Sequence, residues 1–192
     1  MAHDAHAHHH KESFITKYIF SQDHKMIGKQ YLITALIMGG LGIALSAFFR
    51  LKLGWPDAKF PILEAVLGAD AAPDGLLDSN WYLGLVTLHG TIMVFFVLTG
   101  GLSGTFSNLL IPLQVGARDM ASGLLNMIAY WLFFLSSLLM AASLFIETGP
   151  AMAGWTIYPP LSVLEELQPG SGLGMTLWLL SMTVFILSLI HI

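Results

Sequence analysis

Four long runs of apolar residues, separated by shorter polar stretches, dominate the sequence. They cover about residues 30–49, 81–113, 121–146 and 173–192. A helix needs roughly 20 predominantly apolar residues to cross the hydrocarbon core of a bilayer, so each run predicts a membrane-spanning helix. The second run is longer than one crossing requires, which indicates tilt or protrusion. The pattern therefore predicts an all-α, polytopic transmembrane bundle with about four spans.

The stretches between these runs have the character of membrane surfaces. Residues 11–29 mix lysines with aromatic residues, which favours a short segment lying along the membrane. Residues 51–80 contain three prolines and several acidic residues and predict an outer loop. Trp81 and Tyr82 then mark the return to an interface. We therefore divide the chain into a tail and surface segment, residues 1–29, and an incomplete helical domain, residues 30–192.

Basic residues indicate the orientation in the membrane. Five lie before the first span or in the turn after the second: Lys11, Lys17, Lys25, Lys29 and Arg118. Three lie on the opposite side: Arg50, Lys52 and Lys59. Because basic residues concentrate on the cytoplasmic side, this balance favours a cytoplasmic N-terminus in a bacterial-type plasma membrane.

Composition agrees with a membrane protein and excludes several other classes. The chain is 55% hydrophobic and 10% charged, whereas soluble domains carry about 25% charged residues. It has no cysteine, which excludes disulfides and thiolate metal sites. No basic patch indicates nucleic acid. The histidines of the N-terminal tail favour a flexible tail with incidental metal affinity over a dedicated metal site: His3, His6, His8, His9 and His10.

One ionisable side chain, His89, lies inside the second run. Burying such a group in a membrane is costly, so it predicts a functional site; a hydrogen-bonded histidine in a packing surface is the alternative. His89 lies eight residues after Trp81, roughly 12 Å into the outer half of the membrane. At helical spacing one face of this span carries His89, Met93, Phe96, Gly100, Ser103, Gly104 and Ser107.

Polar residues gather at the opposite end of the same span. Asn108 lies about 28 Å farther along the helix than His89, close in sequence to the turn that holds Asp119. Asn126 begins the third span at that inner level. A neutral imidazole beside apolar bulk suits an axial ligand of haem iron. The other intramembrane histidine, His191, is expected on the inner side, so a second ligand for His89 is missing from this chain.

Several ordered motifs resemble one known family. In chain order they are Asp23-His-Lys-Met-Ile-Gly28, Arg50-Leu-Lys-Leu-Gly-Trp-Pro56, Thr87-Leu-His-Gly-Thr-Ile-Met-Val-Phe-Phe96, Ser107-Asn-Leu-Leu-Ile-Pro112, Gly116-Ala-Arg-Asp-Met-Ala121 and Gly154-Trp-Thr-Ile-Tyr-Pro-Pro-Leu161. Together they resemble the N-terminal third or so of subunit I of the haem-copper oxidases, the catalytic subunit of cytochrome c oxidase. The resemblance implies the first helices of a twelve-helix fold.

The resemblance also implies roles for individual residues. His89 would be an axial ligand of a low-spin haem of the a type, with Arg50 and Tyr82 beside that haem. Asp119 would open a proton-uptake channel lined by Asn108 and Asn126. The high-spin haem and copper B of the complete subunit would be ligated beyond residue 192, so catalytic residues are expected outside this chain. Oxidase subunits II and III, cytochrome c and the lipid bilayer are the implied partners.

Some positions depart from the family pattern. Arg118 replaces a proline before the channel aspartate, and Lys52 replaces an acidic residue near the haem arginine. The final Ser188-Leu-Ile-His-Ile192 does not resemble the family's fourth helix, which predicts a truncated fragment. The resemblance implies cytochrome c oxidation coupled to O2 reduction and proton pumping. The alternatives are a quinol oxidase of the same fold, a transporter fragment with His89 and Asp119 as a proton relay, and a small membrane scaffold.

Overall fold

A computed structural model describes residues 13–146, 148–167 and 172–189, and in these ranges the chain forms helices and no strand. The tail histidines and His191 lie outside the described residues. Four helices are long and apolar enough to cross a membrane: His24–Gly54, Ser79–Val115, Gly123–Phe145 and Gly172–Leu189. This confirms the predicted all-α membrane bundle.

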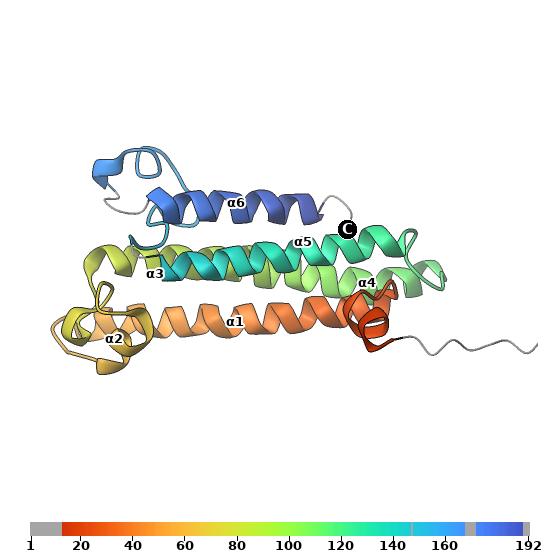
Figure 1. The fold of residues 1–192 in the computed structure, drawn as a ribbon, viewed down its shortest axis with the longest axis horizontal. Coiled ribbons are helices and arrows are strands. Elements are labelled where there is room, and N and C mark those ends of the chain that lie inside the picture. The colour runs from red at the N-terminus through yellow and green to blue at the C-terminus, as the bar shows by residue number, and fades with distance from the viewer. Residues whose placement is uncertain (1–12, 147, 168–171, 190–192) are drawn as a thin grey trace, which may run out of the picture.

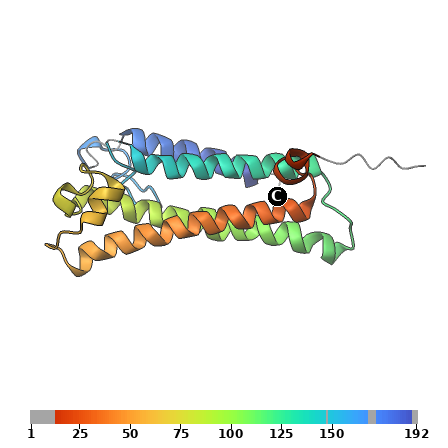
Figure 2. The ribbon, with the colours of Figure 1, turned by 60° about the horizontal axis from the view of Figure 1, so that its bottom comes forward.

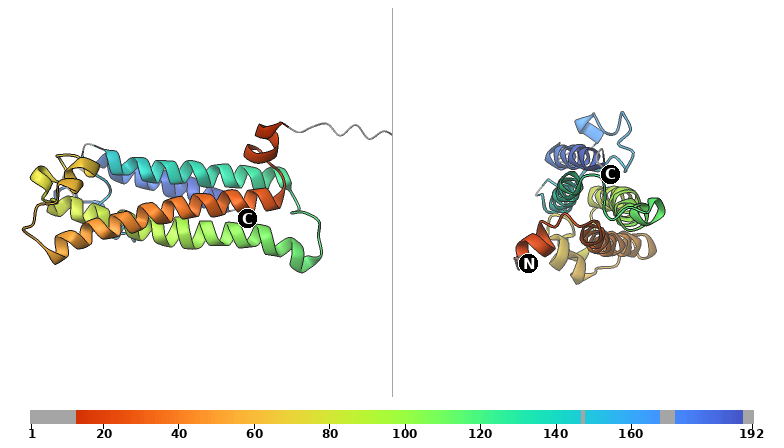
Figure 3. Two further views of the ribbon diagram at one scale, coloured as in Figure 1. Left: turned by 90° about the horizontal axis from the view of Figure 1, so that it is seen from below. Right: turned by 90° about the vertical axis from the view of Figure 1, so that its right-hand side faces the viewer.

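The four long helices run side by side as a bundle (Figures 1 and 2). The first is α1 (His24–Gly54). The second joins α3 (Ser79–Thr91), the π-helix η3 (Ile92–Leu102) and α4 (Ser103–Val115). The third is α5 (Gly123–Ala142) with one 3-10 turn, η4 (Ser143–Phe145), and the fourth is α6 (Gly172–Leu189). Seen end-on in Figure 3, α1 and α6 lie on opposite sides of the bundle, with α5 next to α6.

Short elements lie outside the long helices. They are η1 (Ile15–Ile19), α2 (Pro61–Leu67), η2 (Pro73–Gly75) and η5 (Glu165–Leu167). The expected outer loop, residues 51–80, therefore contains two short helices that the sequence pattern did not predict. Proline at the first position of each, Pro61 and Pro73, favours a helix start because its fixed φ suits that position.

The first helix begins six residues before the predicted start at residue 30. Asp23 has extended backbone angles, and its side chain accepts a hydrogen bond from the backbone N–H of Lys25 at 3.2 Å. A carboxylate at this position satisfies a free donor of the first turn and stabilises the start. The surface segment is correspondingly shorter, and Gln30 holds it through bonds to the Tyr18 and Ile19 carbonyls, both at 2.9 Å.

The π-helix η3 changes which residues of the second helix face inward. The expected face assumed regular α-helical spacing and placed Ser103 in line with His89. Ser103 is instead exposed, and Gly101 and Thr105 are buried. A π-helix uses i→i+5 bonds and turns less per residue, which shifts every later side chain. The predicted face was therefore wrong for Ser103, whereas Gly104, which was placed on the same face, is buried.

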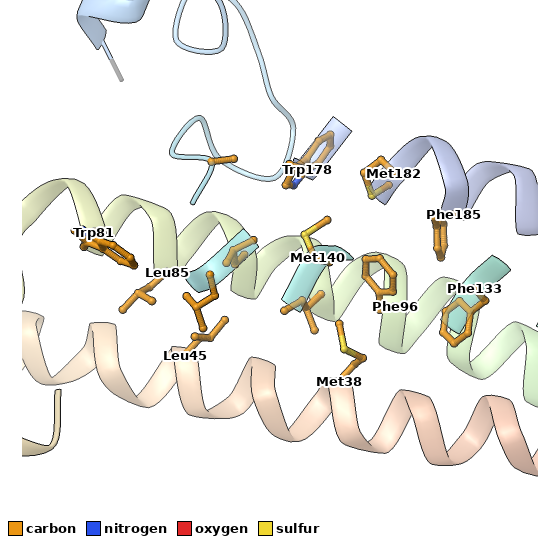
Figure 4. Close-up of a cluster of buried hydrophobic side chains, with 14 of the residues drawn as sticks. Met38, Leu45, Trp81, Leu85, Phe96, Phe133, Met140, Trp178, Met182 and Phe185 are labelled. Atoms are coloured by element: carbon orange, nitrogen blue, oxygen red, sulfur yellow. The ribbon is translucent and has the colours of Figure 1, made fainter. Parts of the chain in front are cut away.

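Aromatic rings and glycines form the interior together. Phe96, Phe133 and Phe185, from three different helices, meet in the core (Figure 4), and the Phe96 and Phe185 ring centroids lie 5.2 Å apart. Gly104 lies against the fully buried ring of Tyr31, where an added Cβ would come within 2.5 Å of a ring carbon. Glycine at such positions lets membrane helices approach closely.

We expect Gly104→Ala to destabilise the bundle by about 1–3 kcal/mol, because the new methyl group displaces the packed Tyr31 ring. Gly40→Ala is the matched control, since an added Cβ there meets nothing within 4 Å. Both changes gain the same helix propensity, so the difference between their thermal unfolding midpoints isolates the contact. Equal midpoints would contradict the close packing of Gly104 on Tyr31.

Candidate functional site

His89 lies in the last turn of α3, where that helix crosses α1. Asp78 begins α3 by accepting hydrogen bonds from the backbone N–H groups of Asn80 at 2.8 Å and Trp81 at 3.3 Å. This cap fixes the start of the helix that carries the imidazole. The ring is half-buried, and its Nδ1 lies 2.8 Å from the carbonyl oxygen of Gly42 in α1.

The Gly42 contact sets the tautomer of the ring. A carbonyl oxygen can only accept, so Nδ1 of His89 carries the proton and donates it. In the neutral imidazole, Nε2 then keeps its lone pair. Metal-binding histidines are typically oriented in this way, with one ring nitrogen donating to a carbonyl and the other free to act as the ligand.

Phe49 joins the residues predicted for the outer site. Its ring centroid lies 5.6 Å from that of His89 and 6.0 Å from that of Tyr82, both edge-on. The guanidinium carbon of Arg50 lies 5.4 Å from the centre of the same ring. Arg50 is exposed, and in the described part of the chain no carboxylate pairs with it. The three residues predicted for this site thus surround Phe49, which the sequence did not predict as a site residue.

The chemistry of this outer site fits one axial ligand of a haem. It offers an imidazole with a free Nε2, aromatic and aliphatic neighbours, and an unpaired cation suited to an acidic ring substituent. His24 is the other histidine within the described ranges. It is the first residue of α1 and lies at the opposite end of the bundle from His89. A second ligand from another helix is therefore not supplied by the described residues.

Asp119 lies in the turn between α4 and α5, where it contacts the start of α1. Its Oδ1 lies 2.9 Å from Nδ1 of His24 and 3.4 Å from the backbone nitrogen of the same residue. His24 is buried, whereas 47% of the Asp119 side chain is exposed. Ser122, not Asp119, caps α5 through the N–H of Leu125. Asp119 is thus an accessible carboxylate held beside a buried imidazole.

Asn108 and Asn126 form a buried pair between α4 and α5. The Asn126 amide donates to Oδ1 of Asn108, and the Asn108 amide donates to the Gly104 carbonyl at 2.7 Å. Gly28 of α1 packs against Asn108, where an added Cβ would lie 3.3 Å from the asparagine Cβ. Oδ1 of Asn126 is buried with no partner in the described residues, and so is the Tyr31 hydroxyl.

The inner residues therefore form two groups rather than one. The structure brings Asn108 and Asn126 together and pairs Asp119 with His24, but no hydrogen bond joins Asp119 to either asparagine in the described ranges. His24 and Gly28 lie one turn apart on α1 and connect the two groups. His24 was missed as a site residue, because its pairing with Asp119 joins positions 95 residues apart.

Comparison with known proteins identifies the family. The family model described as "Cytochrome C and Quinol oxidase polypeptide I" matches residues 26–192. The alternative cytochrome c oxidase subunit 1 of Bradyrhizobium diazoefficiens is 41% identical over 178 residues, which cover 93% of this chain and 27% of that protein. The chain belongs to the cytochrome c and quinol oxidase subunit I family.

Two other curated relatives support the same family assignment. Cytochrome c oxidase subunit 1 of Thermostichus vulcanus is 38% identical over 85% of this chain and 26% of that protein. The Cereibacter sphaeroides protein of the same name is 33% identical over 84% of this chain and 31% of that protein. The chain thus spans about a quarter to a third of the length of these relatives.

The asparagine pair gives a prediction about stability. Asn126→Ala leaves Oδ1 of buried Asn108 without its donor, which should cost about 1–3 kcal/mol. Asn108→Ala should cost a similar amount, and the double variant less than the sum. Unfolding midpoints of the single and double variants form a double-mutant cycle that measures the coupling. Simple additivity would show that the two amides do not interact.

Proposed function

We propose that this chain is part of the catalytic subunit of a terminal respiratory oxidase. In this proposal the complete enzyme oxidises cytochrome c, reduces O2 to water and pumps protons. Family membership supports the class of enzyme, and three relatives are named as cytochrome c oxidase subunits. The single observation in this chain that carries the proposal is the His89 ring, fixed on Gly42 with Nε2 free.

His89 is the proposed axial ligand of a low-spin haem of the a type. Bound there, haem iron would accept and release single electrons. The chain's contribution is orientation: the Gly42 carbonyl holds the imidazole, and the edge of Phe49 limits its rotation. Arg50 supplies a cation for an acidic ring substituent, and Tyr82 flanks the same region through Phe49.

Asp119, Asn108 and Asn126 are the proposed start of a proton-uptake path on the cytoplasmic side. Half-exposed Asp119 can take a proton from water, and buried His24 beside it can hold or pass one. Beyond them, the unpaired Oδ1 of Asn126 and the Tyr31 hydroxyl are polar atoms that ordered water would satisfy. These groups provide the partners that a short chain of water molecules needs.

The proposal also includes parts of the enzyme that lie outside the described residues. The high-spin haem and copper B are assigned to other segments of the complete subunit. Oxidase subunits II and III and cytochrome c are the proposed protein partners. We place the complex in a bacterial plasma membrane with the N-terminus cytoplasmic, because basic residues are concentrated at that end of the bundle.

A quinol oxidase is the second candidate function. The matching family covers both cytochrome c and quinol oxidases by its own description. Membership of that family favours both over a transporter fragment or a scaffold. The names of the curated relatives favour cytochrome c.

We expect His89→Ala to abolish the low-spin haem band in the reduced-minus-oxidised spectrum of the intact complex, because the ring nitrogen is the proposed ligand. His24→Ala is the matched control, since it removes the other described histidine from the opposite end of the bundle. It should leave that band in place. An unchanged band in His89→Ala would reject the ligand assignment.

Asp119→Asn should slow proton uptake at least tenfold while leaving the haem spectra intact, because an amide cannot collect and release protons. Proton uptake by the complex in vesicles, followed with a pH dye after a reductant pulse, measures the effect. Asp74→Asn changes an exposed acid in the outer loop and is the control. Normal uptake in Asp119→Asn would remove this carboxylate from the path.

A further inference from the structure

Two buried threonines of α3, Thr87 and Thr91, lie two residues before and two residues after His89. At 100° per residue, each threonine side chain points about 160° away from the imidazole, on the opposite side of the helix. Thr87 is 1% exposed and Thr91 is 0% exposed. The helix therefore directs His89 towards α1 and two hydroxyl groups towards the elements on its other side.

Each of these hydroxyl groups makes two hydrogen bonds. Thr87 Oγ1 donates to the Leu83 carbonyl at 2.8 Å and accepts from the backbone N–H of Gly154 at 2.9 Å. Thr91 Oγ1 donates to the Thr87 carbonyl at 2.8 Å and accepts from the indole Nε1 of Trp178 at 2.9 Å. A bond to a carbonyl of its own helix is common for a threonine inside a helix. The second bond of each threonine joins α3 to a separate element, the outer loop before α6 or α6 itself.

The part of the outer loop that contacts Thr87 is itself fixed against α3. Gly154 has a φ of 76°, a left-handed conformation that glycine adopts readily, and its carbonyl accepts the N–H of Ile157 at 3.1 Å. The next residue, Trp155, lies on Gly90, where an added Cβ would come within 2.9 Å of the indole. The donor to Thr87 is thus held in a turn that packs on the same helix.

We propose that Thr87 and Thr91 are positioning residues for His89, because they fix the rotation of α3 about its axis and thereby the direction of Nε2. The Gly42 carbonyl holds the imidazole from the side of α1 at 2.8 Å, but a bond on one side alone acts as a pivot. The threonine bonds lie on the opposite side of the helix and resist the turn about that pivot. This inference rests on the proposed function, since the direction of Nε2 matters to a ligand of haem iron.

The first test removes one hydroxyl group while keeping the shape of the side chain. Thr91→Val leaves the indole N–H of Trp178 without its acceptor and releases that side of α3. Carbon monoxide binds reduced haem iron that has lost an axial ligand, so it reports how firmly His89 is held. We expect the share of low-spin haem that binds carbon monoxide in the intact reduced complex to rise about tenfold, because partners that orient a metal ligand typically contribute roughly 10–100-fold.

Further variants show which bond is responsible. Trp178→Phe removes the donor in place of the acceptor, and Thr87→Val removes the bond to the outer loop, so both should raise carbon monoxide binding in the same direction. Thr91→Ser keeps the hydroxyl group and should behave as the parent does. Thr105→Val is the matched control, because Thr105 is buried and its hydroxyl bonds to the Gly101 carbonyl of the same long helix.

Electron paramagnetic resonance of the oxidised complex gives a second readout that a purely structural role would not move. The spectrum of a low-spin haem depends on the orientation of its axial imidazole. We expect the low-spin signal to shift in Thr91→Val and to keep its parent position in Thr105→Val. The same samples give thermal unfolding midpoints, which measure the loss of stability separately.

Two outcomes would overturn the proposal. Parent-like carbon monoxide binding and an unshifted low-spin signal in Thr91→Val and Trp178→Phe, with lower unfolding midpoints, would show that the hydroxyl groups only join the helices. An equal rise in Thr105→Val would show a general loosening of the bundle. His89→Ala separates these outcomes from a failure of the proposed function: a low-spin band that persists in His89→Ala rejects the ligand itself, whereas loss of that band with parent-like threonine variants rejects only the positioning role.

Discussion

The close approach of α1 to the second long helix is the contact on which the outer site depends. Gly42 has no side chain, and a Cβ there would lie 2.8 Å from the sulfur of Met93, one turn beyond His89. The same bare stretch of backbone leaves its carbonyl accessible to the imidazole. A single glycine therefore serves both the packing of two membrane helices and the protonation pattern of the ring between them.

The inner end of the bundle is organised by buried polar pairs. His24 is buried beside Asp119, and Asn108 is buried beside Asn126. A buried polar group away from water is costly unless it finds a partner, so each pair fixes the position of the elements that carry it. The turn after α4 and the start of α5 are thereby held against the first turns of α1. Stability and the proposed proton path use the same side chains.

The sequence predicted the long helices well because uninterrupted apolar runs have few alternatives in a membrane. It missed the start of α1 because the capping role of Asp23 depends on one local backbone angle. It placed His89, Arg50 and Tyr82 on the same side, and the structure groups them around Phe49. An apolar residue such as Phe49 has no signal of its own, because any lipid-facing position carries the same composition.

The inner site was predicted less completely for a different reason. Asp119, Asn108 and Asn126 were found by residue type and depth, yet their partners depend on how three helices meet. His24 lies far from Asp119 in the chain, and only the packing of α1 against the following turn brings them together. The π-helical geometry of residues 92–102 has no simple sequence signature, although the Thr99 hydroxyl bonds to the carbonyl of Val94, five residues earlier.

That π-helical stretch lies between the two ends of one membrane helix. It sets the angle, measured about the helix axis, between the side chains of α3 and those of α4. Because the π-helix turns less per residue, α4 is rotated about the helix axis relative to a regular continuation of α3. Asn108 is thereby directed into the interior, while Ser103 faces outward. Deleting one residue from this stretch would turn the inner end relative to His89 without altering a single side chain at either site. The helix thus acts as a spacer whose pitch, as well as its length, sets how the two sites are oriented relative to each other.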